Sequence, residues 1–193
     1  MFVLTVDQRG SRRDIDRVGP LLADLRHRRL LRPFERTAGD EVQAVDGDAA
    51  TVVDLVLDLV RRGHWSIGVG VGTVEEPLPT QTRAGRGPAF EAARVAVERA
   101  KKAPAAVAVE AADPRAAADA DAALTLTALL VSRRSPQGHA AVALMERGLT
   151  QAEAAAELGI SKQAVSQRLT AAGWQAEISG RLLTERLLRR ADR

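Results

Sequence analysis

Residues 151–170 read QAEAAAELGISKQAVSQRLT and have the spacing of two short helices joined by a tight turn. Ala155 is small enough for the two helices to cross closely. Gly159 suits the turn, because a left-handed backbone is cheap only for a residue without a Cβ. Val165 is placed to anchor the second helix in a core. The spacing therefore predicts a helix-turn-helix, with an ordinary alanine-rich helical hairpin as the alternative.

Short polar and basic side chains gather on the second of these expected helices. Such side chains suit contacts with base edges and phosphates, so we predict that they bind double-stranded DNA. Ser161 can also cap the helix, whereas Arg168 and Thr170 are open to a second interpretation as solvated surface residues. The predicted DNA-binding residues are Ser161, Lys162, Gln163, Ser166, Gln167, Arg168 and Thr170.

The positive charge of the chain is concentrated near this motif. The net charge is only +3, but residues 132–193 carry 10 Lys and Arg against 6 Asp and Glu. Residues 1–131 carry 18 against 19. A basic excess beside the expected helix-turn-helix is what phosphate binding needs.

Composition and the absence of certain segments limit the cellular context. The chain has no cysteine, which excludes disulfides and thiolate metal sites. The start, MFVLTVDQRG, lacks the pattern of a signal peptide, and no apolar run approaches the ~18 residues that span a bilayer. We therefore expect a cytoplasmic protein without a membrane partner.

The first 112 residues alternate between short apolar runs and amphipathic stretches. The predicted order is β-α-β-β-α-β-α-β, which suits an antiparallel sheet covered by helices on one face. We expect its first helix to begin at Ser11 and to be interrupted at Gly19 and Pro20. Glycines alternate along a later strand, at Gly68, Gly70 and Gly72, which indicates a close approach of another element.

The rest of the chain is expected to be helical. Residues 113–134 are rich in alanine and are predicted to form a connector helix. A new helix is expected to start at Ser135 and Pro136, and helices over 137–147, 150–158 and 161–171 are predicted to form a three-helix core. Trp174 is expected to pack the last helix onto this core. The predicted domains are therefore an α+β unit at 1–112, the connector at 113–134 and a helix-turn-helix domain at 135–193.

Acidic residues of the first domain are predicted to meet at one edge of the sheet. Asp7 ends the first strand, and Asp40 and Glu41 lie in the turn between two later strands. Three such carboxylates suit Mg²⁺, and Ser11 and Arg12 suit a phosphate at a helix N-terminus. The predicted site would hold a metal ion or a nucleotide; the alternative is that Asp40 serves the turn and Asp7 caps a neighbouring helix.

These blocks resemble a known family. The segments Asp7 with Gly10-Ser11-Arg12, then 37–43, then 67–70, then 87–94 look like the SatD family, over roughly residues 1–110. More distantly they resemble class III nucleotide cyclases and GGDEF diguanylate cyclases. The resemblance implies a ferredoxin-like, cyclase-like palm, in which Asp7 and Asp40 match metal-binding positions and Glu41 matches an acidic partner.

The chain departs from the cyclase pattern at positions that matter for turnover. The turn reads AGDEV instead of GGDEF, and Glu91 stands near the place where cyclases have an asparagine. The resemblance therefore implies a retained fold without full cyclase catalysis, and we predict no catalytic residues.

Three hypotheses of function follow. The favoured one is a DNA-binding transcriptional regulator, a homodimer whose first domain dimerises or senses a nucleotide ligand. The second is a metal-dependent enzyme that binds or cyclises a nucleotide, with an accessory helical module. The third is a structural adaptor whose helical module binds protein.

Overall fold

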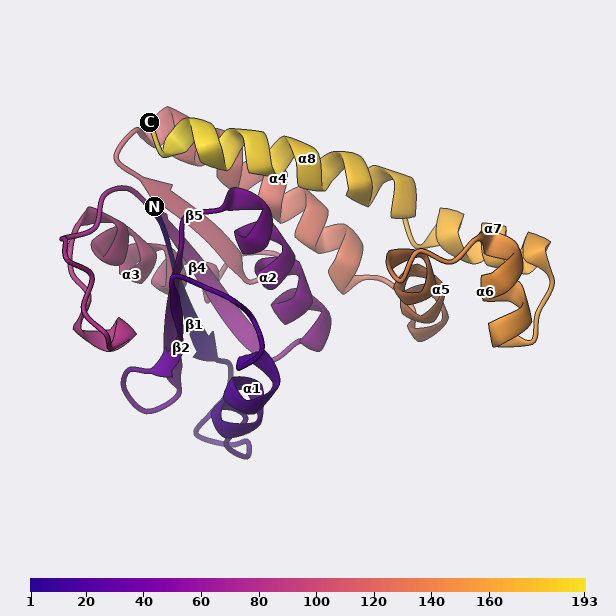
Figure 1. Ribbon diagram of the computed structural model, residues 1–193, viewed down its shortest axis with the longest axis horizontal. Helices are drawn as coiled ribbons and strands as arrows, with labels where there is room; N and C mark the ends of the chain where they lie inside the picture. Colours follow the sequence, from indigo (N-terminus) through magenta and orange to yellow (C-terminus); the bar gives the residue numbers. More distant parts are fainter.

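A five-stranded mixed sheet forms one end of the molecule in this computed structural model, which describes all 193 residues (Figure 1). The strand order is β2-β3-β1-β4-β5. Neighbouring strands are antiparallel except β4 and β5, which are parallel. The strands are β1 (Phe2–Gln8), β2 (Arg32–Arg36), β3 (Glu41–Asp46), β4 (Trp65–Val71) and β5 (Val107–Ala111).

The expectation of a purely antiparallel sheet is therefore wrong at its last strand. The chain leaves β4, passes through helix α3 (Pro88–Ala100) and returns as β5 in the same direction. A crossover through a helix allows parallel pairing, which a short hairpin cannot provide. All eight elements of the predicted order are present in that order.

Helices cover both faces of the sheet, so the predicted one-sided cover is also wrong. Four helices pack on one face: α1 (Val18–Leu25), α2 (Ala49–Arg62), α4 (Pro114–Ser132) and α8 (Trp174–Ala191). Helix α3 packs on the other face. The reason is visible in β1, whose buried side chains alternate between the two faces: Leu4 and Val6 face the four-helix side, and Val3 joins the cluster with α3.

The alternating glycines of β4 allow the close approach of α3. A Cβ on Gly68 would lie 2.3 Å from the backbone nitrogen of Val97, and one on Gly70 would lie 2.1 Å from the carbonyl oxygen of Ala89. No side chain fits in this space. The prediction of close packing is confirmed at Gly68 and Gly70, but not at Gly72, which follows β4 and where a Cβ would lie 3.5 Å from its nearest neighbour, the Ala89 nitrogen.

The first helix begins later than predicted, at Val18 instead of Ser11. Pro20 cannot belong to the interior of a helix, so a helix from Ser11 could not continue past it, whereas Pro20 is tolerated in the first turn of α1. The buried side chain of Gln8 holds the irregular segment before α1, donating to the Ile15 carbonyl (2.7 Å) and accepting from the Arg17 backbone N–H (2.9 Å).

The predicted connector is a packed helix over most of its length. Asp113 caps α4, and Ala120, Leu124 and Val131 belong to the main core with the sheet. Leu188 of the last helix belongs to the same core. Helix α8 therefore packs on α2 and α4, which together with the sheet and its other helices we call the sheet unit. The first residues of α8 contact the three short helices within residues 136–171, which we call the helical module. The division into three domains remains a proposal. No helix is both long enough and apolar enough to cross a membrane.

Candidate nucleic-acid interface

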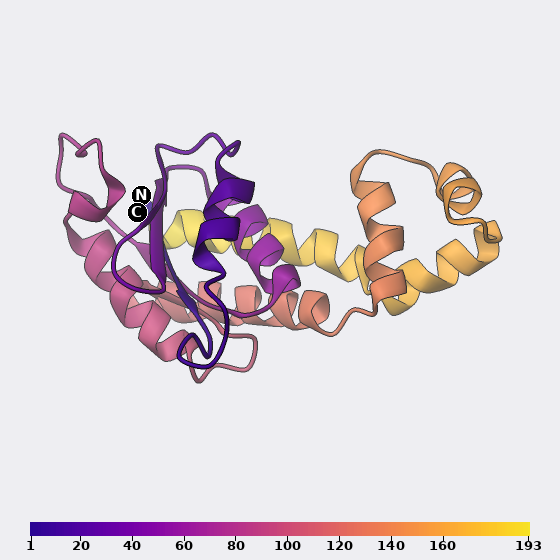
Figure 2. The ribbon, with the colours of Figure 1, turned by 90° about the horizontal axis from the view of Figure 1, so that it is seen from below.

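Three short helices lie at the end of the molecule opposite the sheet (Figures 1 and 2). They are α5 (Pro136–Glu146), α6 (Gln151–Leu158) and α7 (Lys162–Ala171). Each begins with a side chain that accepts a backbone N–H: Ser135 for α5, Thr150 for α6 and Ser161 for α7. Thr150 and Glu153 form a reciprocal capping box. The sequence therefore specifies all three helix starts locally.

The turn between α6 and α7 has the predicted geometry. Gly159 adopts a left-handed conformation with φ 63° and ψ 34°, and its backbone N–H closes the end of α6. Ala155 and Val165 are buried, with 6% and 0% of their surfaces exposed, in a small core shared by the three helices. Trp174 packs against this core, as expected. The helix-turn-helix predicted from spacing is thus present.

Helix α7 presents a polar face to solvent. Gln163, Ser166, Gln167 and Thr170 are exposed and stand at intervals of three, four and seven residues, which places them on the side opposite Val165. The Thr170 hydroxyl donates to the Ser166 carbonyl at 3.0 Å. These four side chains form what we call the outer face of α7.

The remaining predicted DNA-binding residues flank this outer face. Ser161 and Lys162 are exposed at the N-terminus of α7, where the Ser161 hydroxyl accepts from the Ala164 N–H at 3.1 Å. Arg168 is partly buried and lies toward the side of α7 away from Lys162. The structure therefore leaves six of the seven predicted side chains exposed and Arg168 half-buried.

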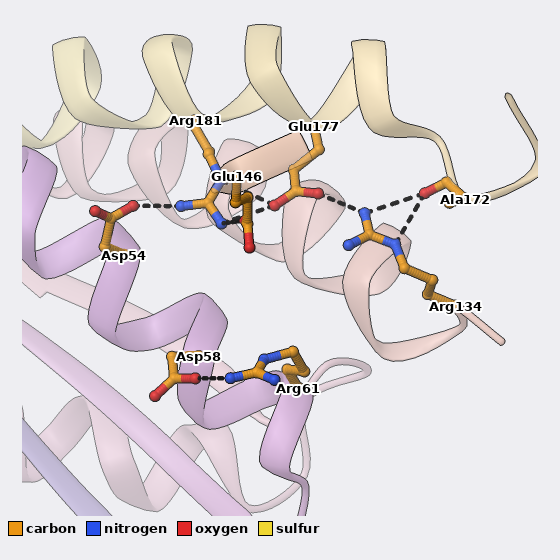
Figure 3. A network of polar contacts seen from close by, with 8 residues as sticks. All are labelled: Asp54, Asp58, Arg61, Arg134, Glu146, Ala172, Glu177 and Arg181. Atoms are coloured by element: carbon orange, nitrogen blue, oxygen red, sulfur yellow. Dashed lines mark hydrogen bonds and ion pairs between the residues drawn. The ribbon is translucent and has the colours of Figure 1, made fainter. Parts of the chain in front are cut away.

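A buried ionic network that no sequence pattern predicts connects the helical module to the sheet unit (Figure 3). Arg134 follows α4 and pairs with Glu177 of α8, and these side chains are 3% and 1% exposed. Arg134 also donates to the Ala172 carbonyl at the end of α7. Arg181 contacts Glu177 at 2.8 Å and also pairs with Asp54 of α2.

The network places charged groups where the end of α7, the start of α8 and helix α2 meet. Residues 134 and 177 are 43 positions apart in sequence, so no local pattern pairs them. Burial of one ion without its partner is costly, because the remaining charge loses water and gains nothing in exchange. The network therefore fixes how α7 is oriented relative to the sheet.

The acidic residues of the first domain come together only in part. Asp7 of β1 and Asp40 border one open cleft of about 810 Å³. Glu41 pairs with Asp7 across the strands, but its carboxylate accepts from the Thr37 hydroxyl at 2.6 Å and does not line the cleft. Nowhere in the chain do three His, Cys, Asp or Glu side chains gather as metal ligands.

The surroundings of Asp7 also disfavour a divalent cation. Burial raises the pKa of its carboxyl above the ordinary value, and the neighbouring carboxylates of Asp40 and Glu41 raise it further, against the effect of Lys101. The Lys101 ammonium lies 3.5 Å from the Asp7 carboxylate. A carboxylate that already pairs with an ammonium group is a poor ligand for Mg²⁺, and no third ligand joins Asp7 and Asp40, so the residues present do not fit a metal ion.

The basic part of the same cleft has a different character. Arg9, Ser11 and Arg12 line it from a turn that follows β1, with Gly10 in a left-handed conformation. Ser11 does not begin a helix, so the predicted phosphate site at a helix N-terminus is wrong in its geometry. The fully buried Ser66 hydroxyl also borders the cleft and has no hydrogen-bond partner.

Comparison with known protein families supports a helix-turn-helix in the C-terminal part of the chain. Residues 142–183 match a family model described as helix-turn-helix. No SatD or cyclase-like domain is found in the residues before them, so that resemblance stays a hypothesis. Comparison with curated proteins and with solved structures gives no match. The match covers α6, α7 and parts of α5 and α8, and DNA binding is the function that such a domain indicates.

Proposed function

We propose that the protein is a DNA-binding transcriptional regulator that inserts the N-terminal half of α7 into the major groove. The observation that carries this proposal is the polar outer face of α7, held on a capped and anchored helix at a free end of the molecule. Lys162, Gln163, Ser166 and Gln167 are positioned for base edges or phosphates, and Ser161 for a phosphate. Arg168 and Thr170 contribute at the edge of the contact.

One helix of this length offers few base contacts, so we propose that the chain acts as a homodimer on two half-sites. Exposed leucines on α4 and α8 support this: Leu126 is 67% exposed, and Leu182 and Leu183 are 54% and 43% exposed. Apolar side chains of this size on neighbouring helices favour burial against a second copy. Sedimentation of the wild type and of Leu126→Glu measures whether these residues hold a dimer.

We further propose that the first domain is a ferredoxin-like palm of the cyclase type that serves as dimeriser or sensor. Support comes from its first six elements, which run β-α-β-β-α-β with β2, β3, β1 and β4 side by side and antiparallel. The boundaries at 112 and 134 belong to the same proposal, with α8 shared between the first and last parts.

The test of DNA binding is a double substitution at the N-terminus of α7. Lys162→Ala with Gln163→Ala is expected to weaken binding by about 1–3 kcal/mol for each lost base contact. Gel retardation and genome-wide mapping of occupied DNA provide the measurement. Wild-type binding should also weaken as salt rises, because phosphate contacts release counterions.

The matched control replaces an exposed lysine and an exposed glutamine on the sheet unit, Lys102→Ala with Gln81→Ala. This variant is expected to bind DNA as the wild type does. Equal retardation by both folded double variants would remove α7 as the DNA-contacting element. Binding that does not change with salt would remove the phosphate contacts.

Binding of a phosphate-bearing ligand such as a nucleotide is a second candidate function, favoured by the cleft at the end of β1. Arginines of the 9–13 turn, Lys101 and the unpartnered Ser66 hydroxyl supply donors there. Titration with ATP or GTP, with and without Mg²⁺, tests it. The enzymatic alternative, cyclisation of the nucleotide, requires a new product in the chromatogram of such a mixture.

A further inference from the structure

A second cavity lies between the sheet unit and the helical module, in the region of Figure 3. Its volume is about 430 Å³, within the range of ~300–1,000 Å³ that small-molecule sites occupy. Helix α2 supplies one wall, the end of α4 another, and α5 with the start of α8 closes it. Leu57, Val131, Val142 and Trp174 provide an apolar part of the lining.

One charged side chain in the cavity lining, that of Arg28, has no ion-pair partner. The four carboxylates of the lining belong to Asp54, Asp58, Glu146 and Glu177, and each has an arginine partner within the structure. Arg28 also lines the cavity, but its Nε is buried and has no hydrogen-bond partner. The side chain of Arg28 is only partly buried, and no hydrogen bond or ion pair holds its terminal nitrogens, so these nitrogens are the donors for a ligand in the cavity.

Neighbouring groups do not offer Arg28 a free anion. Asp58 is held by Arg61 and also by Arg62 at 2.9 Å, and Glu177 is shared by two arginines. His139 also lines the cavity, but an imidazole is either neutral or positively charged and supplies no anion for Arg28. The cavity thus combines an unpaired cationic donor with an apolar wall.

We propose that this cavity binds a small organic carboxylate with an apolar body. The carboxylate accepts hydrogen bonds from the Arg28 guanidinium, and the apolar body occupies the part lined by Val142 and Trp174. Inorganic phosphate satisfies the guanidinium but leaves the apolar wall without a contact, so we favour the carboxylate.

The position of the cavity gives such a ligand a regulatory role, which rests on the proposed DNA binding. Its walls come from both units, so a bound ligand stabilises the arrangement in which α2 and α5 lie together. A ligand changes DNA affinity only when the two arrangements differ in their affinity for it. Ligand binding itself does not depend on DNA and is measured separately.

The probes are benzoate and 3-phenylpropanoate, titrated calorimetrically into the full chain, with neutral benzamide and inorganic phosphate as comparisons. We expect at least one carboxylate to bind, and benzamide and phosphate to bind about tenfold more weakly or not at all. Failure of both carboxylates to bind the folded wild type overturns the proposal. Equal binding of benzamide or phosphate also overturns it.

Two variants locate the site. Arg28→Met keeps the apolar stem and removes the guanidinium, so carboxylate affinity should fall about tenfold or more, while Arg29→Met, at the exposed neighbouring position, should leave it unchanged. Ala143→Phe adds bulk at an exposed cavity wall without disturbing the core and should abolish binding. Full affinity in folded Arg28→Met or Ala143→Phe overturns the proposal.

Gel retardation with and without the bound carboxylate then tests the regulatory step. A shift in DNA affinity that Arg28→Met loses supports it, and an unchanged DNA affinity in saturated protein overturns it. A chain that binds the carboxylate but no DNA overturns the proposed function and leaves the site intact. A chain that binds DNA but neither carboxylate overturns the site alone.

Discussion

Replacement of Glu177 by leucine tests whether the buried ion pair holds the helical module in place. The substitution leaves the Arg134 guanidinium, whose side chain is only 3% exposed, without its carboxylate. The Ala172 carbonyl remains as a neutral acceptor at 3.1 Å, and Arg181 keeps Asp54. The cost therefore falls on Arg134, and removal of one partner of a buried pair typically costs about 3–5 kcal/mol of folding free energy.

The double variant Arg134→Met with Glu177→Leu separates the cost of an orphaned charge from the worth of the pair. Removing both ions at once leaves apolar side chains of similar length, and such replacements are often neutral or stabilising. We expect the double variant to recover most of the stability that Glu177→Leu loses. An exposed pair, Arg147 with Glu157, provides the control, and Glu157→Leu should cost about 1 kcal/mol or less.

Urea denaturation followed by circular dichroism and tryptophan fluorescence measures these differences. The two tryptophans report from opposite ends: Trp65 lies in the sheet core and Trp174 packs on the helical module. In Glu177→Leu, the Trp174 signal should change at lower urea than the signal of Trp65. The reasoning is refuted if Glu177→Leu costs no more than Glu157→Leu, or if the double variant is as unstable as the single one.

Three further predictions concern packing, pH and capping. Gly70→Ala places a Cβ 2.2 Å from the Ala93 nitrogen and should lower the melting temperature sharply, whereas Gly19→Ala meets nothing within 4 Å and should not. Burial and two neighbouring arginines lower the pKa of His139 in the folded protein, so the unfolded chain takes up the proton first as pH falls. The free energy of unfolding should therefore decrease as pH drops below about 6.5, and it should decrease less in His139→Gln. Melting curves at several pH values measure this difference. Ser161→Ala removes the side-chain cap of α7 and should lower the free energy of unfolding by about 1 kcal/mol, whereas Ser161→Asp keeps a capping oxygen and should retain that stability. Equal melting temperatures of the wild type and both variants would contradict a capping role.

The helical module was predictable because its structure is specified over short distances in sequence. A cap, a small residue, a left-handed glycine and a buried valine each act within one or two helical turns. The glycines of β4 are informative for a similar reason, since only close packing explains two of them on one strand face. Local rules of this kind do not depend on where the rest of the chain lies.

Features that depend on distant contacts were not predictable. The cover of both sheet faces depends on α3 passing to the side opposite α2, and nothing in its amphipathic pattern states which side that is. The pairing of Arg134 with Glu177 and the unpartnered Nε of Arg28 appear only when four helices have met. The convergence of Asp7 with Asp40 followed from strand order, but the turn of Glu41 toward Thr37 did not.

Helix α8 provides a structural connection between the sheet unit and the end of the molecule that we propose contacts DNA. Its first residue, Trp174, packs on the helical module, and Leu188 is buried in the core of the sheet unit. A continuous helix of this length spans about 27 Å at ~1.5 Å per residue and bends little, so a change of its angle against α2 and α4 carries α7 with it. The Arg134–Glu177 pair sits where the end of α7 meets the start of α8. In the proposed regulator, a ligand between the two units would therefore act on the junction that sets the direction of α7, and the two recognition helices of the proposed dimer would read their half-sites only when that direction is fixed.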